Sequence, residues 1–294
     1  MDRKEIEKIF APPAPHMVGD GFKMHNFIPG VSRLDMKRMD PFLVLDYGSK
    51  MYFSPADKPR GVGCHPHRGF ETVTIAYHGS VAHEDSTGAG GIINEGDVQW
   101  MTAAKGILHK EFHSKEFTQK GGDFQMIQLW VNLPAAHKMS KPGYQTLKNN
   151  EIPKVDIENQ GGIVEVISGE YKGIKGAART YTSVNLLNTK LNQNGKVKFS
   201  FPANYNTALI VVEGSVMING EKIPGDYFVL FKNEGEEFIV EALENSVILT
   251  MSGEPIHEPI AAHGPFVMNT REELMEAFQD YNTGKFGYME ENLN

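Results

Sequence analysis

The chain has 294 residues, 40% of them hydrophobic and 22% charged, so it can bury a sizeable core in one large or two ordinary domains. Its net charge of −8 argues against a broad phosphate-binding face, and we expect no direct nucleic-acid partner. The single cysteine, Cys64, excludes an intramolecular disulfide. The N-terminus lacks the apolar core of a signal peptide, and apolar runs such as 208–212 are too short to span a bilayer. We therefore expect a cytoplasmic protein, or a nuclear one in a eukaryote, with no membrane partner.

Short apolar stretches between turn residues indicate strands through most of the chain. Residues 1–20 are charged and then proline-rich, which predicts an extended lead-in. Beyond them, stretches of four to eight residues rich in β-branched and aromatic side chains recur, which is typical of strands. These stretches include 42–45, 72–77, 97–100 and 125–131 in the first half, and 163–167, 182–186, 208–212, 227–230 and 246–249 in the second. The polar, proline-punctuated segment 134–155 is the predicted bridge between the halves.

Two local matches predict that the second half repeats the first. Residues 78–81 resemble 213–216, and 94–97 resemble 223–226. Each pair stands at the same place in a series of strands, tight turns and a Gly-Asp step. The interval between the two glycine motifs is longer in the first half, which predicts a longer hairpin there.

Many strands in two similar halves predict an all-β protein of two tandem double-stranded β-helix barrels. We place the first barrel and its lead-in in residues 1–150, and the second barrel in 151–294. A capping box begins at Thr270 and is followed by apolar residues at helical spacing. It predicts a short C-terminal helix, which we assign to the second barrel and expect to cover the end of a sheet.

Two pairs of metal-binding side chains stand at i and i+2: His65 with His67, and His109 with Glu111. On a β-strand such a pair points to one face, so two pairs on facing strands can enclose one cation. We therefore expect one metal ion in the first barrel. Three imidazoles and a carboxylate suit Fe, Mn, Co, Ni, Cu or Zn. A histidine pair of this spacing alone is more often structural, and it is the second pair that favours a metal site.

Other groups near the motif have simpler interpretations. Cys64 should face away from the adjoining ligand as a packed thiol. His78 and His83 flank a hairpin, which favours a role in the turn over ligation. His113 shares the parity of His109 but falls where the strand should end, which predicts a solvated side chain.

The region also resembles the two cupin motifs. Residues 65–71, followed by Gly79, resemble the first motif, H-x-H-x(3)-E and a glycine. Residues 96–109 resemble the second motif, G…G-x-x-H, although this stretch is two residues longer than usual. Thr102 stands where a proline is common.

Longer strings are similar to those of the pirin family and together run from about residue 20 to residue 285. They are 65–73, 83–85, 99–103, 106–111, 128–133 and 263–270. The resemblance implies a bicupin fold and, in some members, quercetin 2,3-dioxygenase activity. For nuclear eukaryotic members it implies iron-dependent transcriptional co-regulation.

The resemblance also bears on the carboxylate ligand, which strand parity leaves open. The general cupin pattern would use Glu71, whereas the pirin pattern uses Glu111. A bulge at Gly69 could turn Glu71 away from the histidines. We expect Glu71 to lie near the cavity without binding the metal. The expected ligands are His65, His67, His109 and Glu111.

The resemblance favours Fe(II), and a metal-dependent dioxygenase that cleaves flavonols such as quercetin with O₂ and releases carbon monoxide. In this hypothesis Glu111 takes the proton of the flavonol hydroxyl as a general base. The competing hypothesis is a non-enzymatic regulatory protein whose metal state is recognised by a protein partner. A weaker third is a barrel that sequesters a small molecule. We expect a monomer.

The predicted repeat allows the metal positions to be sought in the second half. We count back from Gly214 as from Gly79, and forward from Gly225 as from Gly96. The places of the four expected ligands then fall on Ser200, Pro202, Phe238 and Val240. None of these is a good ligand, which predicts a second barrel without metal that serves as structure or as an interaction surface.

Overall fold

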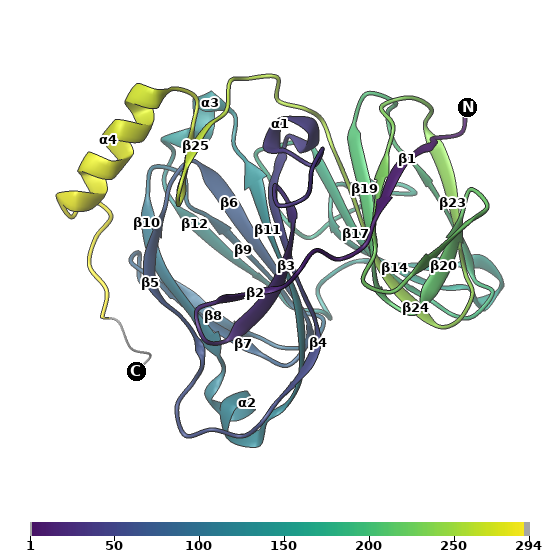
Figure 1. Cartoon of the computed structure of the whole chain (residues 1–294), viewed down its shortest axis with the longest axis horizontal. Coiled ribbons are helices and arrows are strands. Elements are labelled where there is room, and N and C mark those ends of the chain that lie inside the picture. The colour runs from purple at the N-terminus through teal and green to yellow at the C-terminus, as the bar shows by residue number, and fades with distance from the viewer. Residues whose placement is uncertain (1, 291–294) are drawn as a thin grey trace. The chain divides into compact units, whose positions relative to one another are not determined.

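The computed structural model describes residues 2–290, which fold into two compact units built mainly from strands (Figure 1). We call the first barrel the unit made of Ala14–Lys37, Phe42–Asn149 and the described residues from Ile256 onward. The second barrel comprises the described residues up to Pro13, Arg38–Pro41 and Asn150–Pro255. Each unit contains one seven-stranded and one four-stranded sheet.

In the first barrel, all neighbouring strands of the two sheets are antiparallel. The seven-stranded sheet runs β12 (Gly143–Leu147), β9 (Val98–Thr102), β6 (Phe70–His78), β11 (Gly122–Asn132), β4 (Phe42–Phe53), β3 (Phe22–Ile28) and β2 (His16–Val18). The four-stranded sheet runs β5 (Gly61–His67), β10 (Ile107–His113), β7 (Val81–Asp85) and β8 (Gly90–Ile93). An apolar cluster that includes Phe53, Ile93 and Phe124 joins side chains of both sheets.

The second barrel has the same arrangement of strands. Its seven-stranded sheet runs β1 (Ile6–Phe10), β22 (Phe228–Phe231), β19 (Asn206–Glu213), β24 (Ser246–Gly253), β17 (Val184–Leu191), β14 (Gly162–Ser168) and β13 (Lys154–Ile157). Its four-stranded sheet runs β18 (Lys196–Ser200), β23 (Glu237–Ala242), β20 (Ser215–Ile218) and β21 (Glu221–Pro224). The predicted all-β fold of two tandem barrels is therefore confirmed.

The remaining elements are short hairpins and helices. The hairpins are β15 (Glu170–Tyr171) with β16 (Ile174–Lys175), and β25 (Ala261–His263) with β26 (Phe266–Met268). The helices are α1 (Met36–Met39), α2 (Lys115–Lys120), α3 (Ala135–Lys138), a 3₁₀ turn (Glu158–Gln160) and α4 (Arg271–Asn282). The capping box is confirmed, because the Thr270 hydroxyl accepts from the backbone N–H of Glu273, and the Glu273 carboxylate accepts from that of Thr270.

The N-terminal residues are extended, as predicted, but they lie in the second barrel and not in the first. Strand β1 pairs antiparallel with β22, as Figure 1 shows by its purple ribbon among the green strands. Lys4 is buried, and its ammonium donates to the carbonyls of Ala203 and Lys232. These hydrogen bonds and the pairing of an apolar strand explain why the segment completes the second barrel.

The segment 134–155 is likewise more than the predicted bridge, because it contains α3 and the edge strand β12 of the first barrel. Strand β12 pairs with β9 from Gly143 to Leu147. Its Tyr144 packs against an apolar cluster of the first barrel, which holds the strand on the sheet.

The C-terminal helix belongs to the first barrel, in contrast to the predicted range 151–294. Helix α4 contacts β25 and β26 (Figure 1). An apolar cluster of the C-terminal segment includes Leu108 of β10 and has Cys64 of β5 packed against it. A buried ion pair between Arg68 Nη2 and Asp280 Oδ2, at 2.8 Å, links the helix to the residue that follows β5. Cys64 is thus a packed thiol, as predicted.

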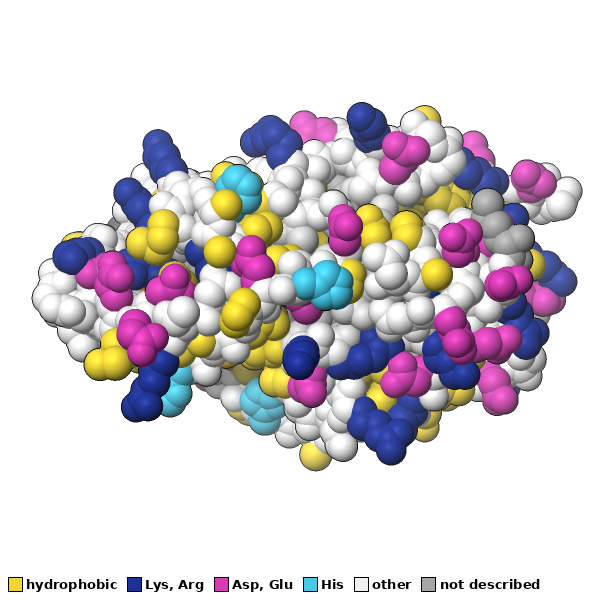
Figure 2. Space-filling model, turned by 90° about the horizontal axis from the view of Figure 1, so that it is seen from above, with side chains coloured by type: hydrophobic (Ala, Val, Ile, Leu, Met, Phe, Trp, Pro, Cys, Tyr) yellow, Lys and Arg dark blue, Asp and Glu magenta, His cyan; other side chains and the backbone are white. Residues whose placement is uncertain are grey.

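None of the helices in the described part of the chain is long and apolar enough to cross a membrane. On the face drawn in Figure 2, lysine and arginine side chains are interspersed with aspartate and glutamate. Such a mixed surface agrees with the net charge of −8 and differs from the continuous basic face of proteins that bind nucleic-acid phosphates.

Candidate metal centre

Strands β5 and β10 place three histidines side by side in the first barrel. His65 stands directly opposite His109 in the antiparallel register, and His67 follows two residues later on the same face. The ring centroids are 4.2 Å apart for His65 and His109, 4.8 Å for His67 and His109, and 4.9 Å for His65 and His67. One nitrogen from each ring lies within 4.8 Å of the others. His67 and His109 are buried and His65 is half-buried.

The hydrogen bonds of these rings leave one nitrogen of each available. His65 Nδ1 lies 2.8 Å from the Gly63 carbonyl, and His67 Nδ1 lies 3.4 Å from the Pro265 carbonyl. A carbonyl only accepts, so both rings are protonated at Nδ1 and present a bare Nε2. His109 Nε2 is buried and has no hydrogen-bond partner among the described residues. An orphaned buried nitrogen beside two available ones fits a metal ion.

The electrostatics of the cluster also favour neutral imidazoles. Burial, and next the neighbouring His65, hold the pKa values of His67 and His109 well below their ordinary value. A metal ligand must be the neutral imidazole, so the folded protein supplies these rings in the binding form.

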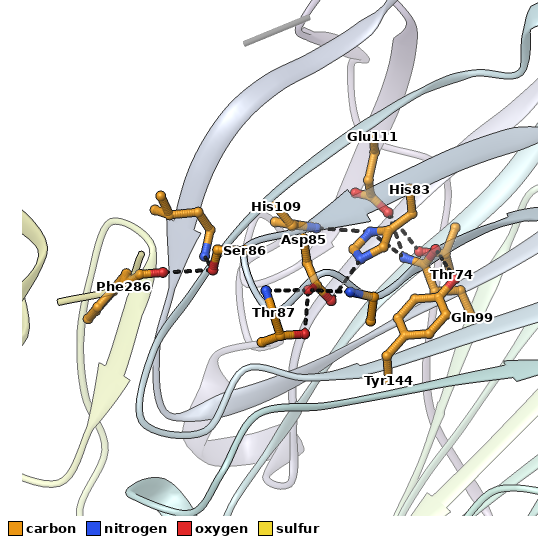
Figure 3. A network of polar contacts seen from close by, with 12 residues as sticks. Thr74, His83, Asp85, Ser86, Thr87, Gln99, His109, Glu111, Tyr144 and Phe286 are labelled. Atoms are coloured by element: carbon orange, nitrogen blue, oxygen red, sulfur yellow. Dashed lines mark hydrogen bonds and ion pairs between the residues drawn. The ribbon is translucent and has the colours of Figure 1, made fainter. Parts of the chain in front are cut away.

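Glu111 lies beside His109 in a second group. Its carboxylate, His83 and His109 each offer one atom within 4.8 Å of the others. Thr74 and Gln99 donate to Glu111 Oε1 at 3.2 and 3.0 Å (Figure 3). Gln128 donates to Oε2 at 3.3 Å. The structure therefore brings His65, His67 and His109 together, and it joins Glu111 to them through the shared His109.

Glu71 lies away from this site because successive side chains of strand β6 point to opposite faces of the sheet. Thr74 reaches Glu111, and the regular pairing of β6 with β9 puts Glu71 on the opposite face of the sheet. Gly69 has φ of +92°, and a Cβ there would collide with the Val267 carbonyl, so the chain turns sharply between β5 and β6. Glu71 is fully buried and accepts from the Thr102 hydroxyl at 2.6 Å. Burial raises its pKa to about 7.

Two histidines have roles that the sequence did not reveal. His83 was expected in a turn, but it is buried with Nδ1 at 3.3 Å from His109 Nδ1. His113 was expected to be solvated, which is wrong: it is 1% exposed and its Nε2 donates to the Gly21 carbonyl at 2.9 Å. Its place at the end of β10 is covered by aromatic rings. These rings are Phe22, Phe53, Phe117 and Phe124. His78 lies half-buried at the hairpin, 3.5 Å from Glu95, as a turn residue would.

In the second barrel, aromatic side chains occupy the places of the histidines. Phe238 of β23 stands opposite Phe199 of β18, as His109 stands opposite His65. The expected counterparts Ser200 and Pro202 are wrong by one position, because the connection to the following strand differs in length; the register gives Phe199 and Phe201. The counterpart of Glu111 is Val240. All of these apolar residues are buried.

Fold and site together define a bicupin protein with a histidine-rich candidate metal centre in its first barrel. The sequence matches the family described as Pirin over residues 21–131 and the Pirin C-terminal cupin domain over residues 186–287. The chain belongs to the pirin family.

Individual relatives support the same assignment. A Pseudomonas aeruginosa protein named "Putative quercetin 2,3-dioxygenase" is 42% identical over 283 residues, which cover 96% of this chain and 98% of that protein. Human pirin is 39% identical over 265 residues, or 88% of this chain and 87% of pirin. The crystal structure of a quercetin 2,3-dioxygenase from Acinetobacter baumannii is similar with a TM-score of 0.92 and 45% identity, covering 98% of this chain and all of that one.

Proposed function

We propose that this chain is a metal-dependent dioxygenase that cleaves flavonols such as quercetin. The observation that carries the proposal is the convergence of His65, His67 and His109, together with the buried Nε2 of His109, which has no hydrogen-bond partner among the described residues. Glu111 completes the expected ligand set of three imidazoles and one carboxylate. The names of the Pseudomonas and Acinetobacter relatives support the substrate class.

The donor set suits a single divalent transition metal, and we propose Fe(II), with Mn, Co, Ni, Cu and Zn as alternatives. When bound, the ion would favour ionisation of a flavonol hydroxyl and hold the resulting enolate for reaction with O₂. Both oxygen atoms of O₂ would enter the ring-opened product, and one ring carbon would leave as carbon monoxide.

Glu111 is the proposed general base for the flavonol hydroxyl. The amides of Gln99 and Gln128 donate to its two oxygens from different strands. The Thr74 hydroxyl lies 3.2 Å from Oε1 and also 2.7 Å from the side-chain oxygen of Gln128. The carboxylate is therefore oriented before substrate arrives. Oε2 accepts only from Gln128, so this oxygen can still take the proton of the substrate.

An aromatic wall adjoins the histidines. Phe70 and Trp130 stack with ring centroids 4.1 Å apart, and they lie 5.0 and 5.1 Å from the ring of His67. Phe70 is fully buried and supports the ring of Trp130, which is only partly buried and would supply a flat apolar surface against which a flavonol could pack.

The decisive experiment compares Glu111→Gln with wild type after anaerobic loading with Fe(II). Oxygen uptake and carbon monoxide release with quercetin should fall by about 10²- to 10⁴-fold in the variant at equal metal content, because the general base is lost. The variant should stay folded, since glutamine keeps an oxygen that Thr74 and Gln99 can reach. Glu95→Gln, in the turn after β8, is the matched control and should keep full activity.

Absence of oxygen uptake by metal-loaded wild type with every flavonol tested would refute the dioxygenase proposal. If quercetin then still changed the ultraviolet–visible spectrum without O₂, the chain would be a binding protein. That outcome would favour the regulatory hypothesis, in which a protein partner recognises the metal-bound form.

A further inference from the structure

His83 lies at the centre of a buried polar network behind the histidine cluster (Figure 3). Its Nδ1 is 3.3 Å from His109 Nδ1 and 3.2 Å from the Gln99 amide nitrogen. Its Nε2 is 3.6 Å from Asp85 Oδ2, and neither of these two atoms has a closer hydrogen-bond partner among the described residues. The imidazole stacks on Tyr144 with centroids 4.9 Å apart.

The chemistry of the neighbours determines where the protons lie. A carboxylate only accepts, so the Gln99 group at 3.0 Å from Glu111 is the amide nitrogen, and the Tyr144 hydroxyl can donate to the amide oxygen at 3.3 Å. The second N–H of the same amide then points to His83 Nδ1, which must accept. His83 therefore carries its proton on Nε2, facing Asp85.

The tautomer of His109 follows from that of His83. Because His83 Nδ1 accepts, the proton shared between the two rings belongs to His109 Nδ1. His109 Nε2 is then bare, and it is the buried nitrogen that has no hydrogen-bond partner among the described residues. The ring that carries it lies 4.2 Å from His65 and 4.8 Å from His67, measured between centroids. Those two rings reach the same state through backbone carbonyls.

We propose that His83 is a positioning residue that holds His109 in the metal-binding tautomer, and that Asp85 in turn fixes His83. The inference rests on the proposed metal centre and adds the device that prepares its most buried ligand. Asp85 is itself fixed, because its Oδ1 accepts from the backbone N–H of Thr87 at 2.8 Å, from the Thr87 hydroxyl at 2.6 Å and from the Ala89 N–H at 3.3 Å.

The first test needs no substitution in the network. NMR of metal-free protein with ¹⁵N-labelled histidine reports the tautomer of each ring, with assignments taken from single histidine variants. We expect His109 protonated at Nδ1 and His83 at Nε2. The opposite tautomer at either ring would overturn the proposal.

The second test measures Zn(II) affinity by chelator competition. His83→Phe keeps a ring that can stack on Tyr144 but removes the acceptor, so affinity should fall by about 10- to 100-fold. His83→Asn should recover most of the loss, because its side-chain oxygen branches from Cγ as Nδ1 does. His78→Phe, on the other side of the same hairpin, should bind like wild type. If His83→Phe bound Zn(II) as tightly as wild type and kept His109 protonated at Nδ1, the proposed positioning role would be refuted, and His83 would serve only in packing.

Asp85→Asn keeps the proposal testable if His83→Phe does not fold. The asparagine retains an oxygen for Thr87 and Ala89 but can present an N–H to His83 Nε2, which would move the His83 proton to Nδ1. Zn(II) affinity should fall in this variant, and an unchanged affinity would refute the role of Asp85. These measurements use neither flavonol nor O₂, so they judge the network even if the dioxygenase proposal fails.

Discussion

At the scale of single residues, Glu71 makes stability depend on pH. Its pKa of about 7 lies above the ordinary value of 4.5, because burial disfavours the charged carboxylate. The folded state thus holds its proton more tightly than the unfolded state. The contribution of Glu71 to the free energy of unfolding is therefore full below pH 4.5 and is lost as the pH rises through 7. The shift corresponds to about 3 kcal/mol.

We therefore predict that Glu71→Gln removes this pH dependence. The free energy of unfolding of the first barrel is measured in urea on the metal-free chain, with the fluorescence of Trp100 and Trp130 as the signal. From pH 5 to pH 8 this free energy should rise in the variant relative to wild type. Glu170→Gln, at an exposed position of β15, should follow wild type at both pH values. A constant difference between Glu71→Gln and wild type across this range would contradict the prediction.

Residue roles were predictable where strand periodicity decides them and not where tertiary packing does. The i, i+2 spacing sufficed to bring His65, His67 and His109 together. His113 follows the same parity, but its environment depends on aromatic rings from four other segments. Burial lowers the pKa of His113 to about 4, and no pattern of residues along the chain indicates this shift. His83 is on the strand beside β10, and only the pairing of Glu111 with His83 reveals that it faces the site.

At the scale of elements, register decides what counting along the chain cannot. Two similar glycine turns do not guarantee connections of equal length. Counting back from Gly214 therefore gave Ser200 as the counterpart of His65, one residue away from the position that the pairing shows. The pairing of Phe199 with Phe238 corrects it. Likewise, the turn at Gly69 separates the face of His67 from that of Glu71. Both points require the hydrogen-bonded partner strand, which lies far away in sequence.

The C-terminal segment yields a prediction at the same scale. Arg68 and Asp280 form an ion pair with side chains only 4% and 8% exposed, and the Arg68 guanidinium lies 4.8 Å from the centre of the Phe286 ring. In Asp280→Ala the buried guanidinium loses its counter-charge, at a cost of about 3 kcal/mol. Hydrogen exchange should then be about 100-fold faster in α4, β25 and β26, and unchanged in β17 and β24.

Lys285→Ala is the matched control, because Lys285 Nζ contacts the same carboxylate at 2.6 Å from a side chain that is 64% exposed. Its removal should cost less than about 1 kcal/mol and leave α4 protected. Equal protection of α4 in wild type and Asp280→Ala would show that apolar packing alone holds the helix. Because Pro265 of this segment accepts from His67 Nδ1, loosening it should also weaken metal binding.

At the scale of the whole molecule, the same strand arrangement supports two different interiors. The first barrel surrounds its histidines with amides and hydroxyls, whereas the second fills the corresponding space with an aromatic cluster. Phe238 lies 5.3 Å from Phe199 and 4.2 Å from Phe231, measured between ring centroids. A close-packed apolar interior stabilises a barrel but offers no ligand atoms. The topology and the repeat could be predicted from the sequence. The aromatic residues that replace the histidines in the second barrel could be identified only from the pairing of the strands in the structure.

We predict from this contrast that each chain binds one equivalent of metal, in the first barrel. Elemental analysis after loading with Fe(II) and desalting should give a ratio near one for wild type, and close to zero for the double variant His65→Ala/His67→Ala. The control His16→Ala/His25→Ala, in β2 and β3, removes two histidines away from the cluster and should retain the metal. Two equivalents in wild type, or metal retained after loss of His65 and His67, would place a site elsewhere. The aromatic interior of the second barrel makes that outcome physically unfavourable, because Phe199, Phe238 and Val240 have no atoms that bind a cation.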